Sequence, residues 1–395
     1  MLIIVLIIFA LMFGIGYYCS RSFFAPYTLM AGLWTIILSL YYILENNFFL
    51  IQNKFPIAIL IWGVCFFVGS YFMQAISKSS VEEQKNVEPN NQIRRVFFVF
   101  AVVFMPIIIC YSFYDAFIKD SSNFFLYLRM VNTGMDESIE GPQFGVLNYF
   151  VSLTFVLYLI ELLMVTKQTK KKVYILFTLN LLLNIITMSK TSFFCLLISS
   201  IVILYFKGKI KIKSIFFCLL GFFCFSVVFQ SIRQLNSEEL VNVFSFVNVY
   251  LLSGAVAFDY LTAIPGSGWF GENTFRFFYA ILSSFGADVP VNATILEFVS
   301  IPELTNTYTM LYPFYVDFGF VGIGIFALFQ GAFYGYLYKK AITGSNMHLL
   351  LYAIFSTYII LEYAGEFLFT NASLNLQYLF YAIFPFIINK RIKIL

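Results

Sequence analysis

The sequence predicts an all-α polytopic membrane protein, and its composition and its apolar segments both lead to this class. Of the 395 residues, 61% are hydrophobic and only 11% are charged, and the mean hydropathy is +0.87. A soluble protein carries roughly 25% charged residues. Long apolar segments recur along the chain, as expected of helices that face lipid and one another. The net charge of +4 is too small to indicate a nucleic-acid partner.

Eleven segments are expected to cross the bilayer, within a range of 10 to 13. About twenty apolar residues suffice, because the hydrocarbon core is about 30 Å thick and a helix rises about 1.5 Å per residue. The stretch 173–206 would extend about 51 Å as one helix, so we expect a hairpin with Ser189, Lys190 and Thr191 at its tip. The predicted spans are 2–19, 24–44, 55–76, 96–114, 144–165, 173–188, 192–206, 214–232, 318–338, 348–369 and 375–389.

The first span is expected to be a retained helix with its N-terminus outside. No cationic segment precedes it, as one would in a cleaved signal peptide, and the first charge is Arg21. The six cysteines lie in apolar runs without disulfide-framework or metal-ligand spacing, which predicts that they act as small hydrophobic residues. They are Cys19, Cys65, Cys110, Cys195, Cys218 and Cys224.

The distribution of Lys and Arg predicts a cytoplasmic C-terminus, because these residues are retained on the cytoplasmic side of spans. With that orientation, 18 of the 24 cations are cytoplasmic, including the lysines of 167–172 and 207–213. The external cations are Lys54, Lys119, Arg129, Lys190, Arg233 and Arg276.

Residues 1–395 are expected to form one integral membrane domain with two long external loops, 115–143 and 233–317, and one cytoplasmic loop, 77–95. Function on such a scaffold is expected in the long loops. These loops contain apolar runs too short to span, which predicts re-entrant or interfacial helices. The runs are 124–131, 246–258 and 275–285; alternatively, 246–258 belongs to a further membrane hairpin.

The external cations are the candidate binding residues for an anionic ligand. Arg276 lies among Phe275, Phe277, Phe278 and Tyr279, which would hold it at the depth of lipid diphosphates. The planar guanidinium donates two hydrogen bonds to one phosphate. Lys190, at a short hairpin tip, either contacts the ligand or extends to the headgroups.

The candidate acidic residues include Glu362 and Glu366, one helical turn apart in the predicted span 348–369. Ionisable residues within spans are candidates for function, and Glu366 is nearer the outer end. The alternative is a salt bridge between helices. Asp317 opens the predicted ninth span, where capping of a helix start is favoured over a ligand contact. The other external candidates are Asp259 and Asp288.

Known catalytic motifs are lacking in the sequence: it has no Cys/His metal cluster, Gly-rich phosphate loop, Gly-x-Ser-x-Gly elbow or Asp-x-Asp pair. The only histidine, His348, lies at the cytoplasmic start of a span, where a structural role is favoured over catalysis. We therefore expect no cofactor and no metal site.

Several motifs resemble those of Wzy-type O-antigen and oligosaccharide repeat-unit polymerases. Ser189-Lys190-Thr191-Ser192 resembles a short hairpin of that family, and Arg129 with Gly145 fits an Arg-and-Gly spacing of some members. The other matches are Asn306-Thr307-Tyr308-Thr309, Asp317-Phe318-Gly319 with Gly322, Tyr250 with Gly254, and Phe258-Asp259.

The resemblance implies a GT-C-like glycosyltransferase fold in the bacterial inner membrane, with a periplasmic active site and both substrates carried on undecaprenyl pyrophosphate. The product would be O antigen or capsular polysaccharide, and a Wzz-type chain-length regulator is a candidate partner. The related O-antigen ligases resemble this plan but use an external histidine, which the sequence lacks. A lipid-linked oligosaccharide flippase is the alternative from another class, although the long external loops argue against it.

In the implied reaction, Arg276 neutralises the leaving pyrophosphate and Asp259 or Glu366 acts as the base. Pyrophosphate or sugar contacts are expected from Lys190, Arg233, Arg129, Asn306, Tyr308 and Asp317.

Overall fold

The structure is a computed structural model, and it describes residues 1–77, 87–121, 124–133, 141, 144–233, 243–261, 268–293 and 296–392. The chain divides into two compact units, each assembled from separate segments. Unit 1 comprises Met1–Ser79, Asn242–Lys340 and Tyr358–Ser373, and unit 2 comprises Ser80–Val241, Ala341–Thr357 and Leu374–Leu395. Each unit is described by itself.

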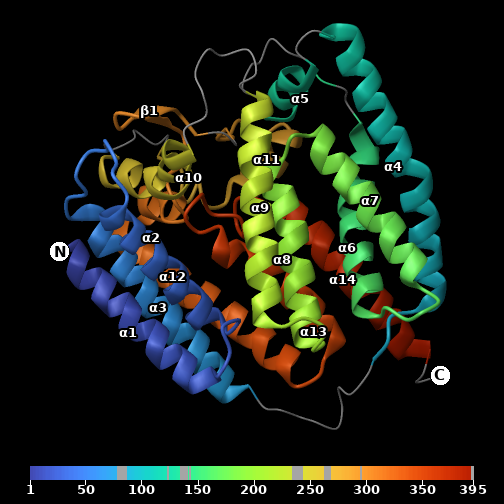
Figure 1. Ribbon diagram of the computed structural model, residues 1–395, viewed down its shortest axis with the longest axis horizontal. Coiled ribbons are helices and arrows are strands. Elements are labelled where there is room, and N and C mark those ends of the chain that lie inside the picture. The colour runs from blue at the N-terminus through green and yellow to red at the C-terminus, as the bar shows by residue number, and fades with distance from the viewer. Residues whose placement is uncertain are drawn as a thin grey trace. The chain divides into compact units, whose positions relative to one another are not determined.

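Unit 1 contains six helices and a small two-stranded sheet among its described residues (Figure 1). Its membrane-type helices are α1 (Leu2–Ser20), α2 (Pro26–Ile43), α3 (Lys54–Ile76) and α12 (Tyr312–Ile342), the last of which extends just past the unit. The predicted loop contributes α10 (Val243–Asp259), α11 (Arg276–Ser284), β1 (Val299–Ser300) and β2 (Leu304–Thr305).

Unit 2 is built from helices in the part of the chain that is described. They are α4 (Asn91–Lys119), α5 (Phe124–Thr133), η1 (Gly145–Asn148), α6 (Tyr149–Leu163), α7 (Lys170–Ile186), α8 (Lys190–Phe206) and α9 (Ile212–Arg233), with most of α13 (Asn346–Ile360) and α14 (Ala372–Ile392).

Small residues let α3 and α12 of unit 1 pack closely. A Cβ atom on Gly69 would lie 2.3 Å from the Leu328 carbonyl oxygen, and one on Gly331 would lie 2.2 Å from that of Phe66. Small residues at helix interfaces favour association in membranes, because van der Waals contact between backbones replaces contact with lipid. Aromatic side chains fill the space beside this contact, with the rings of Trp62 and Phe314 stacked 5.8 Å apart.

The predicted external segments of unit 1 lie at one end of its helices. The backbone N–H of Phe49 donates to the Ile301 carbonyl at 3.2 Å, and the Asn248 side chain donates to the Glu45 carbonyl at 2.7 Å. The segment between α2 and α3 therefore contacts both α10 and the β1–β2 region (Figure 1).

In unit 2, one buried ion pair joins α4 to α6. Nε and Nη2 of Arg94 donate to the two carboxylate oxygens of Glu161 at 2.9 and 2.6 Å. Glu161 is fully buried and is the only acidic residue of α6, so the bidentate contact compensates its buried negative charge. Farther along α4, Ile108 and Ile109 pack with Tyr127 of α5 and Leu183 of α7.

Each of the eleven predicted spans overlaps a helix over at least part of its length, and the stretch 173–206 is divided into α7 and α8, as expected of a hairpin. By length and hydropathy, six described helices qualify as candidate membrane spans: α1, α2, α3, α4, η1 with α6, and α12. The helices α8, α13 and α14 are apolar but shorter. The chain is thus an α-helical, multi-pass membrane protein.

One predicted span is wrong at its C-terminal end. The span 348–369 was expected to carry Glu362 and Glu366 on one helical face, but α13 ends at Ile360. Both glutamates lie in the irregular segment before α14. The Glu362 carboxylate binds Trp34 of α2, and the Glu366 carboxylate binds Gln330 of α12 and the backbone of its own loop.

Candidate functional site

Asp317 lies near the start of α12, where Gly319 interrupts the helix with φ 63° and ψ −155°. Glycine suits this conformation because a Cβ atom would be strained at that φ. The Asp317 carboxylate reaches the turn before α11, accepting from Asn273 Nδ2 at 2.8 Å and from the Thr274 backbone N–H at 2.7 Å. Asp317 therefore holds that turn instead of capping the helix in which it lies.

A chain of hydrogen bonds continues from Asp317 to Arg276. Asn292 Nδ2 donates to Asn273 Oδ1 at 2.9 Å, and Arg276 Nε donates to the Asn292 carbonyl oxygen. Arg276 is the first residue of α11 and is half-buried. Two of the predicted site residues, Arg276 and Asp317, are thus brought into one polar network by two asparagines.

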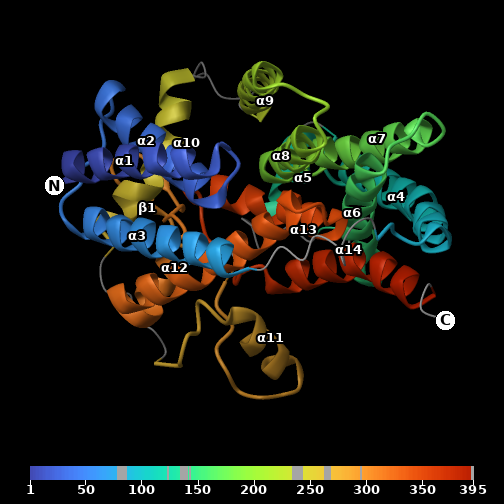
Figure 2. The ribbon, with the colours of Figure 1, turned by 90° about the horizontal axis from the view of Figure 1, so that it is seen from below.

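The helix α11 is amphipathic, with apolar side chains on its outer face. Phe278 is 59% exposed and Phe285, which follows the helix, is 86% exposed. On the inner side, Phe275 packs against Phe318 and Phe326 of α12. Figure 2 shows α11 on the side of α12 that faces away from α1 and α2. An exposed apolar face of this kind is typical of helices that lie in a membrane interface.

Asp259, the last residue of α10, caps the N-terminus of α3. Its Oδ1 accepts from the Phe55 backbone N–H at 2.7 Å and its Oδ2 from that of Gln52 at 2.5 Å. Phe55 lies in the first turn of α3, where N–H groups have no partner within the helix, and Gln52 lies just before the helix. Asp259 is 7% exposed, so the geometry gives it a structural task in joining α10 to α3.

Glu366 is enclosed by its own loop. Backbone N–H groups of Leu368, Phe369 and Thr370 donate to its carboxylate at 2.8 to 3.1 Å, and Gln330 Nε2 of α12 donates at 3.1 Å. Successive backbone N–H groups in such a turn form an anion-binding concavity. Here the anion is the side chain of Glu366 itself, which fastens the loop to α12.

Glu362 was noted in the sequence, but its partners were not foreseen. Its Oε2 accepts from the indole N–H of Trp34 at 2.8 Å, and its backbone carbonyl accepts from the Met310 N–H at 2.9 Å. Oε1 is buried and has no hydrogen-bond partner in the described structure. Glu362 therefore links α2 to the segment that carries the Asn306 motif.

The Asn306-Thr307-Tyr308-Thr309 motif forms a buried hydroxyl cluster with α10. Ser253 Oγ lies 3.0 Å from Thr305 Oγ1 and 3.1 Å from Thr307 Oγ1. Tyr308 donates to the Glu297 carbonyl at 2.9 Å, and burial raises the pKa of its hydroxyl. Asn306 is half-buried beside them. The motif thus fixes the loop that precedes α12.

The structure gives a reason for the glycine in the motif Tyr250 to Gly254 of α10. A Cβ atom on Gly254 would lie 2.7 Å from the Tyr363 carbonyl oxygen and 3.3 Å from the Thr309 nitrogen. Only a residue without a side chain permits this approach without a shift of the backbone. Gly254 therefore brings three segments of unit 1 together.

The remaining predicted residues belong to unit 2. Lys190 is the first residue of α8, and the preceding Ser189 caps that helix by accepting from the Ser192 N–H at 3.2 Å. Arg129 is half-buried in α5. Arg233 is the last residue of α9, and its side chain lies outside the described part of the chain. These three cations and Arg276 belong to different units.

The only histidine, His348, has a structural setting in α13. Its Nδ1 lies 2.7 Å from Ser345 Oγ, and the side chain is 8% exposed. This agrees with the helix-end role that the sequence favoured. Among the described residues, no group of three or more His, Cys, Asp or Glu side chains could hold a metal ion.

Asn273 and Asn292 are the site residues that sequence reasoning missed. Both are short polar side chains in the loop that surrounds the amphipathic run 275–285. Asn273 lies close to Arg276 in the chain, which was the available signal, but Asn292 lies 16 residues from Arg276 and Asp317 lies 44 residues from Asn273, so their pairing is visible only in the folded loop.

Comparison with protein families gives one match. The family model described as "Putative O-antigen polymerase" matches residues 143–363, which is more than half of the chain. The matched region includes α10, α11 and the Asp317 network. Comparisons with curated proteins and with solved structures give no significant match.

Proposed function

The chain belongs to the O-antigen polymerase family, and from this membership we propose that it joins oligosaccharide repeat units carried on undecaprenyl pyrophosphate. The reaction takes place at the periplasmic face of the bacterial inner membrane, with the N-terminus periplasmic and the C-terminus cytoplasmic. We further propose eleven spans in a GT-C-like arrangement. The apolar composition and the membrane-type helices support the location, and the distribution of cations supports the orientation.

Arg276 is the residue on which this proposal rests, because it begins an interfacial helix and is anchored through Asn292 and Asn273 to Asp317. In the reaction, a hydroxyl oxygen of the acceptor sugar attacks the anomeric carbon of the donor glycan. The bond from that carbon to pyrophosphate breaks, and undecaprenyl pyrophosphate leaves. Arg276 stabilises the negative charge that develops on the leaving group. Such a task requires a guanidinium held in place before the substrate arrives, which the asparagine chain provides.

The acceptor hydroxyl gives its proton to Asp259 or Glu366. Both carboxylates accept hydrogen bonds from backbone N–H groups, so either one must lose at least one of these bonds to serve as the base. We propose that six further residues bind the pyrophosphate and the sugars directly or shape the loops that bind them. They are Lys190, Arg233 and Arg129 of unit 2, and Asn306, Tyr308 and Asp317 of unit 1. A Wzz-type regulator of chain length is the proposed protein partner.

The experiment is a complementation of a deletion strain, read out as the lipopolysaccharide pattern on a gel. Arg276→Ala is expected to give a core that carries a single repeat unit, because loss of one donor to a developing charge lowers the rate about 100-fold or more. Arg276→Lys should restore little polymerisation, because a lysine ammonium lacks the planar guanidinium that donates two hydrogen bonds to one phosphate. The protein should remain at normal levels in the membrane.

Arg95→Ala is the matched control, since Arg95 is an exposed arginine of α4 in the other unit. It should give long glycan chains. Normal chain lengths with Arg276→Ala would remove Arg276 from the mechanism. A bare core in the deletion strain would indicate a flippase or a ligase, and would overturn the polymerase proposal.

A further inference from the structure

A cavity of about 310 Å³ lies between α6 and α7 in unit 2, and nothing in the polymerase mechanism uses it. Most of its lining is apolar or aromatic. Tyr158 forms a buried wall at 4% exposure, whereas Tyr174 is 67% exposed. The lining residues are Tyr158, Leu162, Val165, Lys170, Val173, Tyr174 and Phe177. Its volume is at the lower end of the range typical of small-molecule sites.

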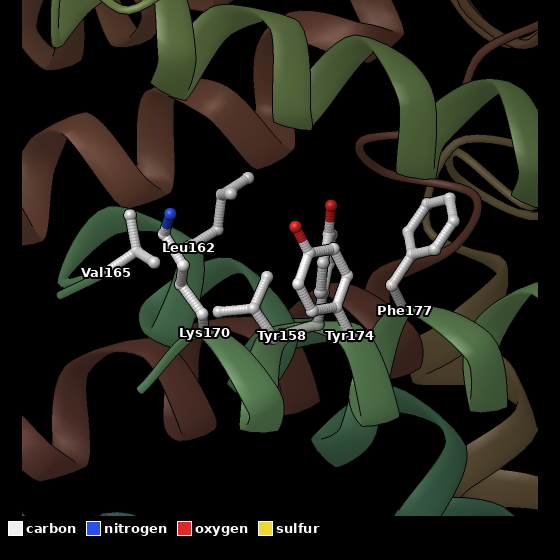
Figure 3. Close-up of a pocket in the computed structure, with 7 residues that line it drawn as sticks. Tyr158, Leu162, Val165, Lys170, Tyr174 and Phe177 are labelled. Atoms are coloured by element: carbon white, nitrogen blue, oxygen red, sulfur yellow. The ribbon is translucent and has the colours of Figure 1, made fainter. Parts of the chain in front are cut away.

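The polar groups of the cavity share one side. Figure 3 shows the amine of Lys170 and the hydroxyls of Tyr158 and Tyr174 pointing the same way, with Val165 and Leu162 beside Lys170 and Phe177 beyond the tyrosines. The Tyr158 hydroxyl lies 3.0 Å from Ser200 Oγ, which fixes its position. The cavity therefore combines a cationic end with an apolar and aromatic end.

The charge on the chain around Lys170 is positive. Lys167, Lys170, Lys171 and Lys172 lie within six residues, and in the described part of the chain no carboxylate forms a salt bridge with them. Three of these lysines occupy the first turn of α7, which has no acidic residue. Cations at this end of a helix are unfavourable unless an anion is also present, because the backbone dipole is positive there.

We propose that this cavity binds an anionic phospholipid of the cytoplasmic leaflet. The phosphate contacts Lys170 and the exposed Tyr174 hydroxyl, and the start of an acyl chain lies along Leu162, Val165 and Phe177. The predicted orientation places the 163–170 junction at the cytoplasmic surface, where anionic headgroups meet clusters of lysine. The occupant is a lipid and not a soluble anion, because the lining is apolar apart from the Lys170 amine and the two tyrosine hydroxyls (Figure 3).

The test uses the full-length protein purified in detergent and native mass spectrometry with two lipids of identical acyl chains. Phosphatidylglycerol should bind more tightly than phosphatidylcholine. Lys170→Ala should weaken phosphatidylglycerol binding about fivefold, the effect expected for one lysine near an anionic surface, and should leave phosphatidylcholine unchanged. Tyr174→Phe, which removes only the exposed hydroxyl, should weaken it less.

Lys213→Ala is the control, because Lys213 lies in the first turn of α9 and does not line the cavity. Its phosphatidylglycerol binding should equal that of the unchanged protein. The proposal would be overturned by equal affinities for the two lipids. It would also be overturned if Lys170→Ala and Lys213→Ala reduced the affinity for phosphatidylglycerol equally. Displacement of the lipid by inorganic phosphate alone would also overturn it, in favour of a phosphate site. None of these measurements depends on polymerase activity.

Discussion

The two units satisfy their buried and half-buried carboxylates in different ways. In unit 1, Asp259, Asp317 and Glu366 all accept hydrogen bonds from backbone N–H groups of irregular segments or helix starts. In unit 2, Glu161 instead binds the guanidinium of Arg94 between two helices. Carboxylates thus organise loops in unit 1 and fasten helices in unit 2. This difference predicts that charge removal will alter loop geometry in one unit and folding in the other.

The largest effect is expected from Arg94→Ala, which leaves Glu161 buried without its partner. Breaking a buried ion pair on one side costs about 3–5 kcal/mol. The variant should show a large fall in folded, monodisperse protein after detergent extraction. Arg95→Ala, which changes the exposed neighbour, should not.

The double variant Arg94→Met, Glu161→Leu sharpens the comparison in unit 2. Replacing both charges by apolar side chains removes the need for compensation, so much of the folded protein should return. If Arg94→Ala extracts as well as the unchanged protein, the ion pair does not fasten α4 to α6.

Asp317→Ala should act through loop geometry and thus on the glycan product. It removes the acceptor for Asn273 and Thr274, and each lost hydrogen bond to a charged group is worth about 1.5–3 kcal/mol. We expect short glycan chains at near-normal membrane levels, because the helices of unit 1 do not depend on this contact. Asn292→Ala, which deletes the next link but leaves the Asn292 carbonyl that binds Arg276, should give a milder defect.

A product pattern that is normal in Asp317→Ala would contradict the positioning role of the network. Parallel loss of protein from the membrane would instead assign Asp317 to folding, and would remove the contrast between the units.

Asp259→Asn separates capping from catalysis. Asparagine also caps helices well, so stability should fall by no more than about 1 kcal/mol. If Asp259 only joins α10 to α3, the variant should keep long glycan chains and a thermal midpoint in detergent close to that of the unchanged protein. Loss of polymer at an unchanged midpoint would identify Asp259 as the base.

The positions of the helices could be predicted from the sequence, because every backbone polar group in lipid must be satisfied within a helix. The contacts of the site could not. The Trp34 partner of Glu362 is 328 residues away in the chain, and the Arg94 partner of Glu161 is 67 residues away. An ionisable residue in an apolar segment made Glu366 a candidate, but only the folded loop shows that three consecutive N–H groups enclose its carboxylate.

The smallest effect is expected at Lys119, a predicted external cation of unit 2. Its Nζ lies 3.1 Å from Asp115 Oδ1 and its side chain is 44% exposed. Exposed ion pairs contribute about 0–1 kcal/mol, and the Tyr127 hydroxyl still donates to Asp115 at 2.8 Å when Lys119 is gone. Lys119→Ala should therefore leave both the thermal midpoint and the glycan pattern unchanged. A loss of folded protein as large as that expected for Arg94→Ala would contradict this prediction. It would mean that the exposed Lys119–Asp115 pair stabilises the protein as much as the buried Arg94–Glu161 pair, and that the contact of α5 with α4 depends on charge.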